Sequence, residues 1–135
     1  LHVPTKEIVA NAAHARKLGL KGVKIKVGKP HVSEDVKRLA AVRKEIGAEM
    51  ELMVDANQGF TVAEAIRRAR HFEALDLAWF EEPLPAEDMT GHTLLRASTS
   101  LPIAVGESLY SLSHFREYLQ HGACTIVQTD VARIG

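Results

Sequence analysis

The stretch Leu52–Gly59, LMVDANQG, decides how the chain is organised. Its first half is apolar enough to form a buried strand, yet Asp55 and Asn57 stand at its end. Successive side chains of a strand point to opposite faces, so we expect Asp55 and Asn57 to share one face. A carboxylate at the end of a buried strand is unfavourable unless a metal or a partner group compensates its charge. The stretch therefore predicts a strand that carries a polar site at its carboxyl end.

Two later stretches repeat this arrangement. The runs WFEEP (residues 79–83) and IAVGE (residues 103–107) also place carboxylates directly after apolar residues. The interval is the same both times, 26 residues from Asp55 to Glu81 and 26 from Glu81 to Glu107. Carboxylate oxygens at the ends of three successive strands would suit a hard divalent cation. The pattern therefore predicts one converging metal site.

Helix-like and strand-like segments alternate along the whole chain. Apolar patterns predict strands at residues 22–28, 52–59, 77–82, 102–107 and 124–130, with helices between them. The third of these helices is predicted only around residues 94–98. This alternation predicts right-handed crossovers and a parallel sheet, either open and doubly wound or closed into a barrel. No GxGxxG or GxxxxGK loop follows a strand, which disfavours a nucleotide-binding sheet. Polar residues on one face of every strand favour a barrel with a polar mouth.

Composition excludes several classes of partner. The chain has 135 residues, 46% of them hydrophobic and 25% charged, which is typical of a soluble globular domain. Seventeen basic residues balance seventeen acidic ones, so we expect no nucleic acid and no membrane surface as partner. Apolar runs reach only strand length, the start LHVPTKEIV lacks a signal-peptide pattern, and the single cysteine excludes an intrachain disulfide. We therefore expect a cytoplasmic protein.

Five motifs, taken together, resemble the enolase superfamily and specifically its mandelate racemase group. They are Lys24-x-Lys26, Asp55-x-Asn57, Glu81-Glu82-Pro83, Gly106-Glu107 and Asp130, one for each predicted strand. The resemblance implies an α/β fold, a TIM (β/α)8-type barrel. A full barrel needs eight strands and typically ~250 residues, so residues 1–135 are expected to form a partial barrel covering about the second to sixth strands. The N-terminal capping domain and the last barrel strands of the family are expected to be absent from the chain.

The resemblance also implies a metal and a base. Asp55, Glu81 and Glu107 correspond to the ligands of one Mg²⁺, Lys26 to the general base, and Lys24 to a neighbour that contacts the substrate carboxylate. Removing a proton next to a carboxylate builds up a second negative charge, and a hard cation can stabilise the resulting ene-diolate. Lys26 needs a lowered pKa to act as a base, and we expect the like charge of Lys24 and the metal to lower it.

Two further positions follow from the same resemblance. Asp130 corresponds to the aspartate that orients a catalytic histidine on the next strand, and that histidine would lie beyond Gly135. Asn57 matches a substrate-binding position near the metal. Among the residues outside these roles, we expect Glu82 to be a structural hydrogen-bond partner, Trp79 to fill the core, Cys124 to be buried and each of the seven histidines to lie at the surface.

The implied function is Mg²⁺-dependent abstraction of the proton alpha to the carboxylate of a hydroxy acid or sugar acid. Dehydration by a lyase of the acid-sugar dehydratase type is favoured, and racemisation is the other outcome. An alternative is a cycloisomerase or dipeptide epimerase, which would carry a lysine in place of Asp130 and usually an aspartate in place of Glu107. An alternative of another class is a truncated, non-catalytic barrel fragment. We expect a homo-oligomer, and we expect the 135 residues alone to be inactive, because the capping domain and the general acid are missing.

Overall fold

The structure is a computed structural model and describes residues 3–134 of the chain. Within this range a five-stranded sheet has the order β1-β2-β3-β4-β5, and every neighbouring pair is parallel. The strands are β1 (Gly22–Lys26), β2 (Glu51–Asp55), β3 (Trp79–Glu81), β4 (Ile103–Val105) and β5 (Ile126–Val127). The helices are α1 (Thr5–Lys17), α2 (Val32–Ile46), α3 (Val62–Phe72), with the short 3-10 turn η1 (Glu73–Leu75) after it, α4 (Met89–Ala97) and α5 (Leu112–Gln120).

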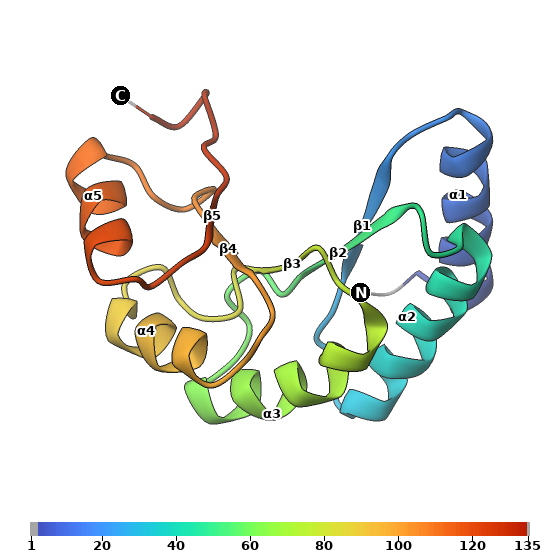
Figure 1. The fold of residues 1–135 in the computed structure, drawn as a ribbon, viewed down its shortest axis with the longest axis horizontal. Coiled ribbons are helices and arrows are strands. Elements are labelled where there is room, and N and C mark those ends of the chain that lie inside the picture. The colour runs from blue at the N-terminus through green and yellow to red at the C-terminus, as the bar shows by residue number, and fades with distance from the viewer. Residues whose placement is uncertain (1–2, 135) are drawn as a thin grey trace.

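The helices form an arc around one side of the sheet (Figure 1). Each of the helices α2 to α5 connects two neighbouring parallel strands, which is the crossover that the alternating pattern predicts, and α1 precedes β1. The described part of the chain places no helix on the concave side of the sheet (Figure 1). The prediction of an α/β chain with a parallel sheet in sequence order is therefore confirmed.

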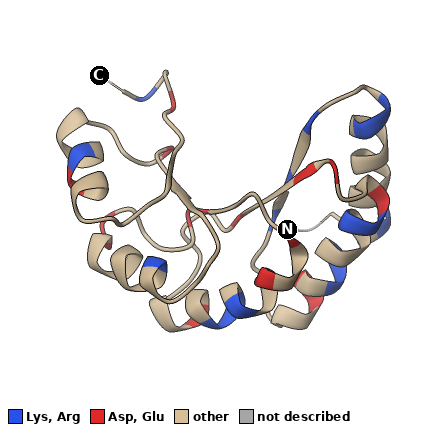
Figure 2. Ribbon diagram, viewed as in Figure 1, with Lys and Arg blue, Asp and Glu red and all other residues tan. Residues whose placement is uncertain are grey.

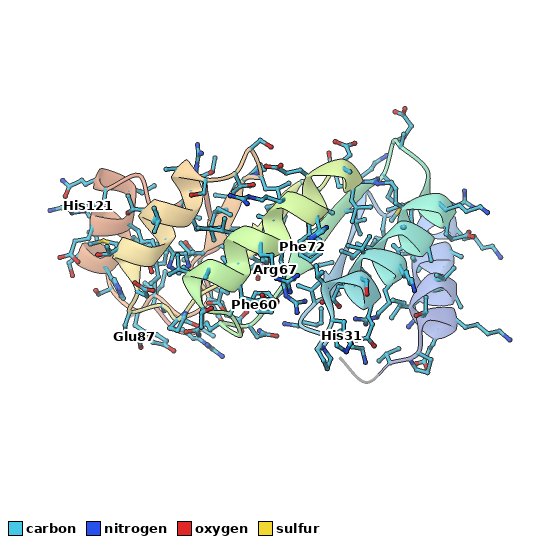
Figure 3. All side chains as sticks on the ribbon, turned by 90° about the horizontal axis from the view of Figure 1, so that it is seen from below. His31, Phe60, Arg67, Phe72, Glu87 and His121 are labelled. Carbon is cyan, nitrogen blue, oxygen red and sulfur yellow. The ribbon has the colours of Figure 1, made fainter. Side chains whose placement is uncertain are left out.

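The hydrophobic core lies between the sheet and the helices. Leu52 and Val54 of β2 are fully buried, and Phe80 of β3 is fully buried between the rings of Phe60 and Phe72. Figure 3 views the molecule from the side of the helices and shows Phe60 and Phe72 beside α3. Because side chains alternate along a strand, this core leaves the opposite face to polar residues.

Side-chain caps fix where several helices begin. The hydroxyl of Thr61 accepts the N–H of Glu64 at the start of α3, and Ser111 does the same for His114 at the start of α5. The carboxylate of Asp88 accepts the N–H of Gly91, so α4 begins at Met89, five residues before the predicted helix. The strands are also shorter than predicted: β3, for example, covers Trp79–Glu81 instead of residues 77–82.

Charged residues of both signs are distributed over the helices, as the equal numbers of basic and acidic residues lead one to expect. Basic and acidic residues both occur along α2 and α3 (Figure 2). Among the described residues, no helix combines the length and the apolar character needed to cross a membrane.

One prediction about the histidines is wrong. His92 of α4 is fully buried, and its ring stacks edge-on against Tyr118 of α5. Its Nδ1 lies 2.9 Å from the carbonyl oxygen of Asp88 and 3.2 Å from the Tyr118 hydroxyl, which itself donates to the carbonyl oxygen of Ala86. The position of α5 over α4 buries this ring, and nothing in the local sequence shows that contact. Cys124 is buried, as predicted.

Candidate metal centre

The parallel register places three of the predicted site residues side by side. Lys26, the last residue of β1, pairs with Asp55, the last residue of β2, and Asp55 pairs with Glu81, the last residue of β3. Equivalent positions on neighbouring parallel strands point to the same face. One amine and two carboxylates therefore lie in a row at the carboxyl edge of the sheet.

Glu107 reaches the same place by a different route, because it lies two residues beyond the end of β4. Gly106 makes this possible with a φ of 146°, a conformation that residues with a side chain rarely adopt. A Cβ at this position would lie 2.3 Å from the backbone carbonyl oxygen of Gln128, so the chain also needs glycine for its close approach to the segment after β5. The glycine thus sets the direction in which Glu107 leaves the sheet.

The three carboxylates form a group that could hold a metal ion. One oxygen each from Asp55, Glu81 and Glu107 lies within 4.8 Å of the other two. Asp55 and Glu81 are 1% and 2% exposed, and Glu107 is partly exposed. Ligands of an octahedral Mg²⁺ with bonds of 2.0–2.1 Å are about 3–4 Å apart, so small side-chain rotations would complete the fit. An all-oxygen, anionic donor set suits a hard divalent cation.

Two lysine amines balance the charge of this group. The Nζ of Lys24 lies 2.6 Å from Oε1 of Glu81 and 3.7 Å from Oδ2 of Asp55. The Nζ of Lys26 lies 2.5 Å from the same Oδ2 of Asp55. Burial by itself lowers the pKa of Lys24, but its hydrogen bond with Glu81 and the nearby carboxylates outweigh burial and raise that pKa. Lys24 is therefore firmly held as a cation next to Lys26, which is the like charge that the sequence analysis expects there.

The second oxygen of Glu81 is held by two donors. Its Oε2 accepts from Nε1 of Trp79 at 2.9 Å and from Nε2 of Gln128 at 2.6 Å. Trp79 is half-buried and turned toward the carboxylates, so the prediction that it fills the core is wrong. The sequence analysis did not identify Gln128 as a site residue. The available signal was its position near the end of the predicted fifth strand, two residues before Asp130. The two hydrogen bonds fix the orientation of the Glu81 carboxylate, as hydrogen bonds to metal-binding carboxylates commonly do.

Asn57 does not lie where strand alternation places it. β2 ends at Asp55, and Asn57 has a φ of 45°, so it is part of a tight loop. Its backbone N–H donates to Oδ1 of Asp55 at 2.8 Å, while its side chain is exposed. The expectation that Asp55 and Asn57 share a strand face is therefore wrong, and the contact with the carboxylate comes from the backbone instead.

Asp130 lies beyond β5 and outside the carboxylate group. It accepts the N–H of Ala132 at 2.9 Å and forms an ion pair with Arg133 at 3.3 Å. Arg133 also lies 3.8 Å from the carboxylate of Glu107 and donates to its carbonyl oxygen at 3.2 Å. Arg133, which the sequence analysis did not single out, thus connects Asp130 to the metal group. The histidine expected to pair with Asp130 would lie outside the described residues.

Glu82 does not belong to the carboxylate group that could hold a metal ion. It is 4% exposed, its Oε1 accepts the N–H of Ser108 at 3.1 Å, and burial raises the pKa of its carboxyl. This contact agrees with the expected role of Glu82 as a structural hydrogen-bond partner.

The chain is similar to several characterised proteins. The family model described as enolase C-terminal domain-like matches residues 7–135. The L-talarate/galactarate dehydratase of Salmonella typhimurium is 43% identical over the whole chain and 34% of its own length. The 3,6-anhydro-alpha-L-galactonate cycloisomerase of Streptomyces coelicolor is 37% identical, again over the whole chain and 37% of its own length. The solved L-talarate dehydratase of Polaromonas sp. JS666, complexed with Mg and L-glucarate, has a TM-score of 0.96 and 40% identity over the whole chain and 38% of its own.

These comparisons confirm the resemblance found in the sequence and the predicted fold class, a partial TIM-type barrel. The chain spans little more than a third of the length of the proteins it matches.

Proposed function

The chain belongs to the enolase C-terminal domain-like family, and from this premise we propose that the protein containing it abstracts the proton alpha to the carboxylate of a hydroxy acid or sugar acid. We propose Mg²⁺ as the metal, with Asp55, Glu81 and Glu107 as its ligands. The observation that carries the proposal is the meeting of three carboxylate oxygens within 4.8 Å, beside two lysine amines. The magnesium in the related dehydratase structure supports the choice of metal.

In this proposal the chemistry is divided between the metal and the two lysines. Bound Mg²⁺ would supply the positive charge that offsets the second negative charge on the substrate carboxylate as the alpha proton leaves. Lys26 takes that proton at Nζ, for which it must first leave its ion pair with Asp55 and lose its own proton. Lys24 contacts the substrate carboxylate and remains a cation, in keeping with its raised pKa.

Loss of a beta-hydroxyl group, and hence dehydration, is our preferred outcome after proton abstraction. The relative with 43% identity is a dehydratase of acid sugars, which supports this choice. The departing hydroxyl needs a proton donor, and we assign this role to a histidine that Asp130 would orient. Asp130 would then have to exchange its present partner, Arg133, for that histidine. Asn57 is proposed as a substrate contact, because its exposed side chain lies in the loop directly after Asp55.

A cycloisomerase reaction is the second candidate, and the Streptomyces coelicolor relative supports it. Both reactions begin with the same proton abstraction, so the same metal group and the same base serve either one. Glu107 as the third carboxylate, and Asp130 in place of a lysine, favour the dehydratase. A panel of sugar acids, with analysis of whether water is lost, would separate the two reactions.

The test begins with the metal. In the native-length protein, Asp55→Asn and Glu81→Gln should each weaken Mg²⁺ binding in calorimetric titrations, because each removes a charged ligand. Lys26→Ala should abolish exchange of the substrate alpha proton with solvent deuterium, while Lys44→Ala, at an exposed position of α2, should leave that exchange unchanged. Unchanged Mg²⁺ affinity in both carboxylate variants would refute the metal site, and exchange that persists in Lys26→Ala would remove Lys26 as the base.

A further inference from the structure

Three polar residues connect the loops that carry the proposed metal ligands. Gln58 lies in the loop after β2, while Glu82 and Ser108 directly follow the proposed ligands after β3 and β4. We call these three residues the loop clamp. None of them belongs to the carboxylate group that could hold a metal ion.

The loop clamp forms a closed set of hydrogen bonds. Nε2 of Gln58 donates to Oγ of Ser108 at 2.8 Å, and Oε1 of Gln58 accepts the N–H of Ala86 at 2.8 Å. The N–H of Ser108 donates to Oε1 of Glu82 at 3.1 Å, and the N–H of Gln58 donates to the carbonyl oxygen of Glu82 at 2.7 Å. Each loop is thereby joined to both of the others.

The loop clamp holds backbone that is strained. Among the described residues, four non-glycine positions have a positive φ, and three of them are Asn57 (45°), Gln58 (62°) and Glu82 (39°). Such conformations are unfavourable for residues with a side chain and persist only where the surrounding structure enforces them. The strain is therefore concentrated in the loops beside Asp55 and Glu81, where the clamp bonds can enforce it.

The sheet itself does not fix all three carboxylates. Asp55 and Glu81 are the last residues of their strands, and Glu107 lies beyond the end of β4. Past these points the paired register ends, although single backbone hydrogen bonds still join the segments, such as Ala56 N–H to the carbonyl oxygen of Glu81 at 3.0 Å and Phe60 N–H to that of Pro83 at 3.1 Å. The spacing of the carboxylates then also depends on what joins the loops, and the clamp supplies the side-chain hydrogen bonds among them.

We propose that the loop clamp is a positioning network that fixes the spacing of Asp55, Glu81 and Glu107 before the metal binds. This inference rests on the proposed function, because it assumes that these carboxylates are the metal ligands. Without the clamp the strained loops can relax, and the binding of the metal must then bring the carboxylates back together. The metal affinity falls by the free energy of that reordering. Gln58 and Ser108 act through the ligands and are positioning residues.

The test compares Gln58→Ala and Ser108→Ala in the native-length protein. Isothermal titration calorimetry with MgCl₂ gives the Mg²⁺ affinity, and thermal unfolding without Mg²⁺ reports on the fold. We expect the Kd for Mg²⁺ to rise about 10-fold or more, in line with the 10–100-fold effects of other outer-sphere partners. Ser108→Thr keeps the hydroxyl and should restore the affinity. Gln120→Ala, at the exposed end of α5, is the matched control for loss of an amide and should leave the Kd unchanged.

Ser108→Ala removes only one hydroxyl and keeps the experiment decisive if Gln58→Ala does not fold. A lower unfolding midpoint with an unchanged Kd in the folded protein would show a merely structural role and overturn the inference. Failure of Ser108→Thr to restore the affinity would overturn it as well. Asp55→Asn distinguishes the two proposals: if it weakens binding and the clamp variants do not, only the clamp is refuted. If Asp55→Asn also has no effect, the metal site itself fails.

Discussion

Replacing Asp35 with alanine should destabilise the fold more than any exposed substitution in α2. The Asp35 carboxylate is fully buried, and it accepts from Nη1 of Arg68 at 2.6 Å and from Nη1 of Arg38 at 3.1 Å. It also accepts the N–H groups of Gly28 and Lys29, at 2.8 and 3.0 Å. The carboxylate thus joins α2 and α3 to the loop that follows Lys26 in the sequence.

The expected magnitude follows from burial. Arg38 and Arg68 are 6% and 3% exposed, so Asp35→Ala leaves two guanidinium groups without their buried anion. Removing one partner of a buried ion pair typically lowers the free energy of unfolding by about 3–5 kcal/mol. That is a large part of the roughly 5–15 kcal/mol by which domains are stable. Each kcal/mol lost from the free energy of unfolding lowers the midpoint of thermal unfolding by about 2–4 °C, so Asp35→Ala should lower that midpoint by roughly 10 °C.

Two further variants give an internal ranking. Arg68→Met leaves Asp35 with Arg38 and its two backbone donors, so its effect should be smaller than that of Asp35→Ala. Glu64 is the other acidic partner of Arg68, and the Glu64 side chain is 29% exposed. Glu64→Gln should therefore change the free energy of unfolding by about 1 kcal/mol or less. Urea unfolding followed by circular dichroism measures all three. A loss below about 1 kcal/mol in Asp35→Ala, or a larger loss in Glu64→Gln, would refute the argument from burial.

Three other predictions concern pH and backbone. Hydrogen bonds, first of all with Arg67, lower the pKa of Glu64 to about 2. The contribution of Glu64 to folding stability should therefore be lost as the pH falls from about 4.5 toward 2. When the free energy of unfolding is measured against pH, it should fall less steeply in Glu64→Gln than in the unchanged protein over this range. Burial lowers the pKa of His92, so the folded protein keeps its ring neutral. Below about pH 6.5 the unfolded chain binds a proton at His92 more readily than the folded one, so folding stability should fall. In His92→Phe this decrease in the midpoint of thermal unfolding below about pH 6.5 should be absent. Gly106→Ala should be much more destabilising than Gly47→Ala, because a Cβ at position 106 would lie 2.3 Å from a backbone oxygen, whereas nothing lies within 4 Å at position 47. Equal shifts in the two unfolding midpoints would contradict that reason.

The sequence predicted the carboxylate group well because its members follow from local patterns. Each of Asp55, Glu81 and Glu107 stands at the end of an apolar run, and parallel strands bring such ends to one edge of a sheet. The same reasoning was wrong for Asn57, because it assumed that the strand continues past Asp55. The end of a strand depends on where its neighbours stop pairing, and that is not visible in a single segment.

Contacts around the site were missed for the same reason. The donors to Oε2 of Glu81 are Trp79 of its own strand and Gln128 of the segment after β5, and Arg133 reaches both Asp130 and Glu107. These partners are up to 47 residues apart in sequence, and polar side chains at such positions also occur on exposed loops. Their roles require the register of the sheet and the paths of the loops.

The sequence by itself determined the order of the elements, the parallel sheet and the face that carries the acidic residues. Hydrophobic periodicity and glycine positions are local properties, so one chain read in order is enough to find them. Only the tertiary structure decided the lysine ion pairs of those acids, the hydrogen bonds of the loop clamp, and the burial of Asp35 and His92. Each of these depends on atoms from segments far apart in sequence, whose distances are fixed when the helices pack on the sheet.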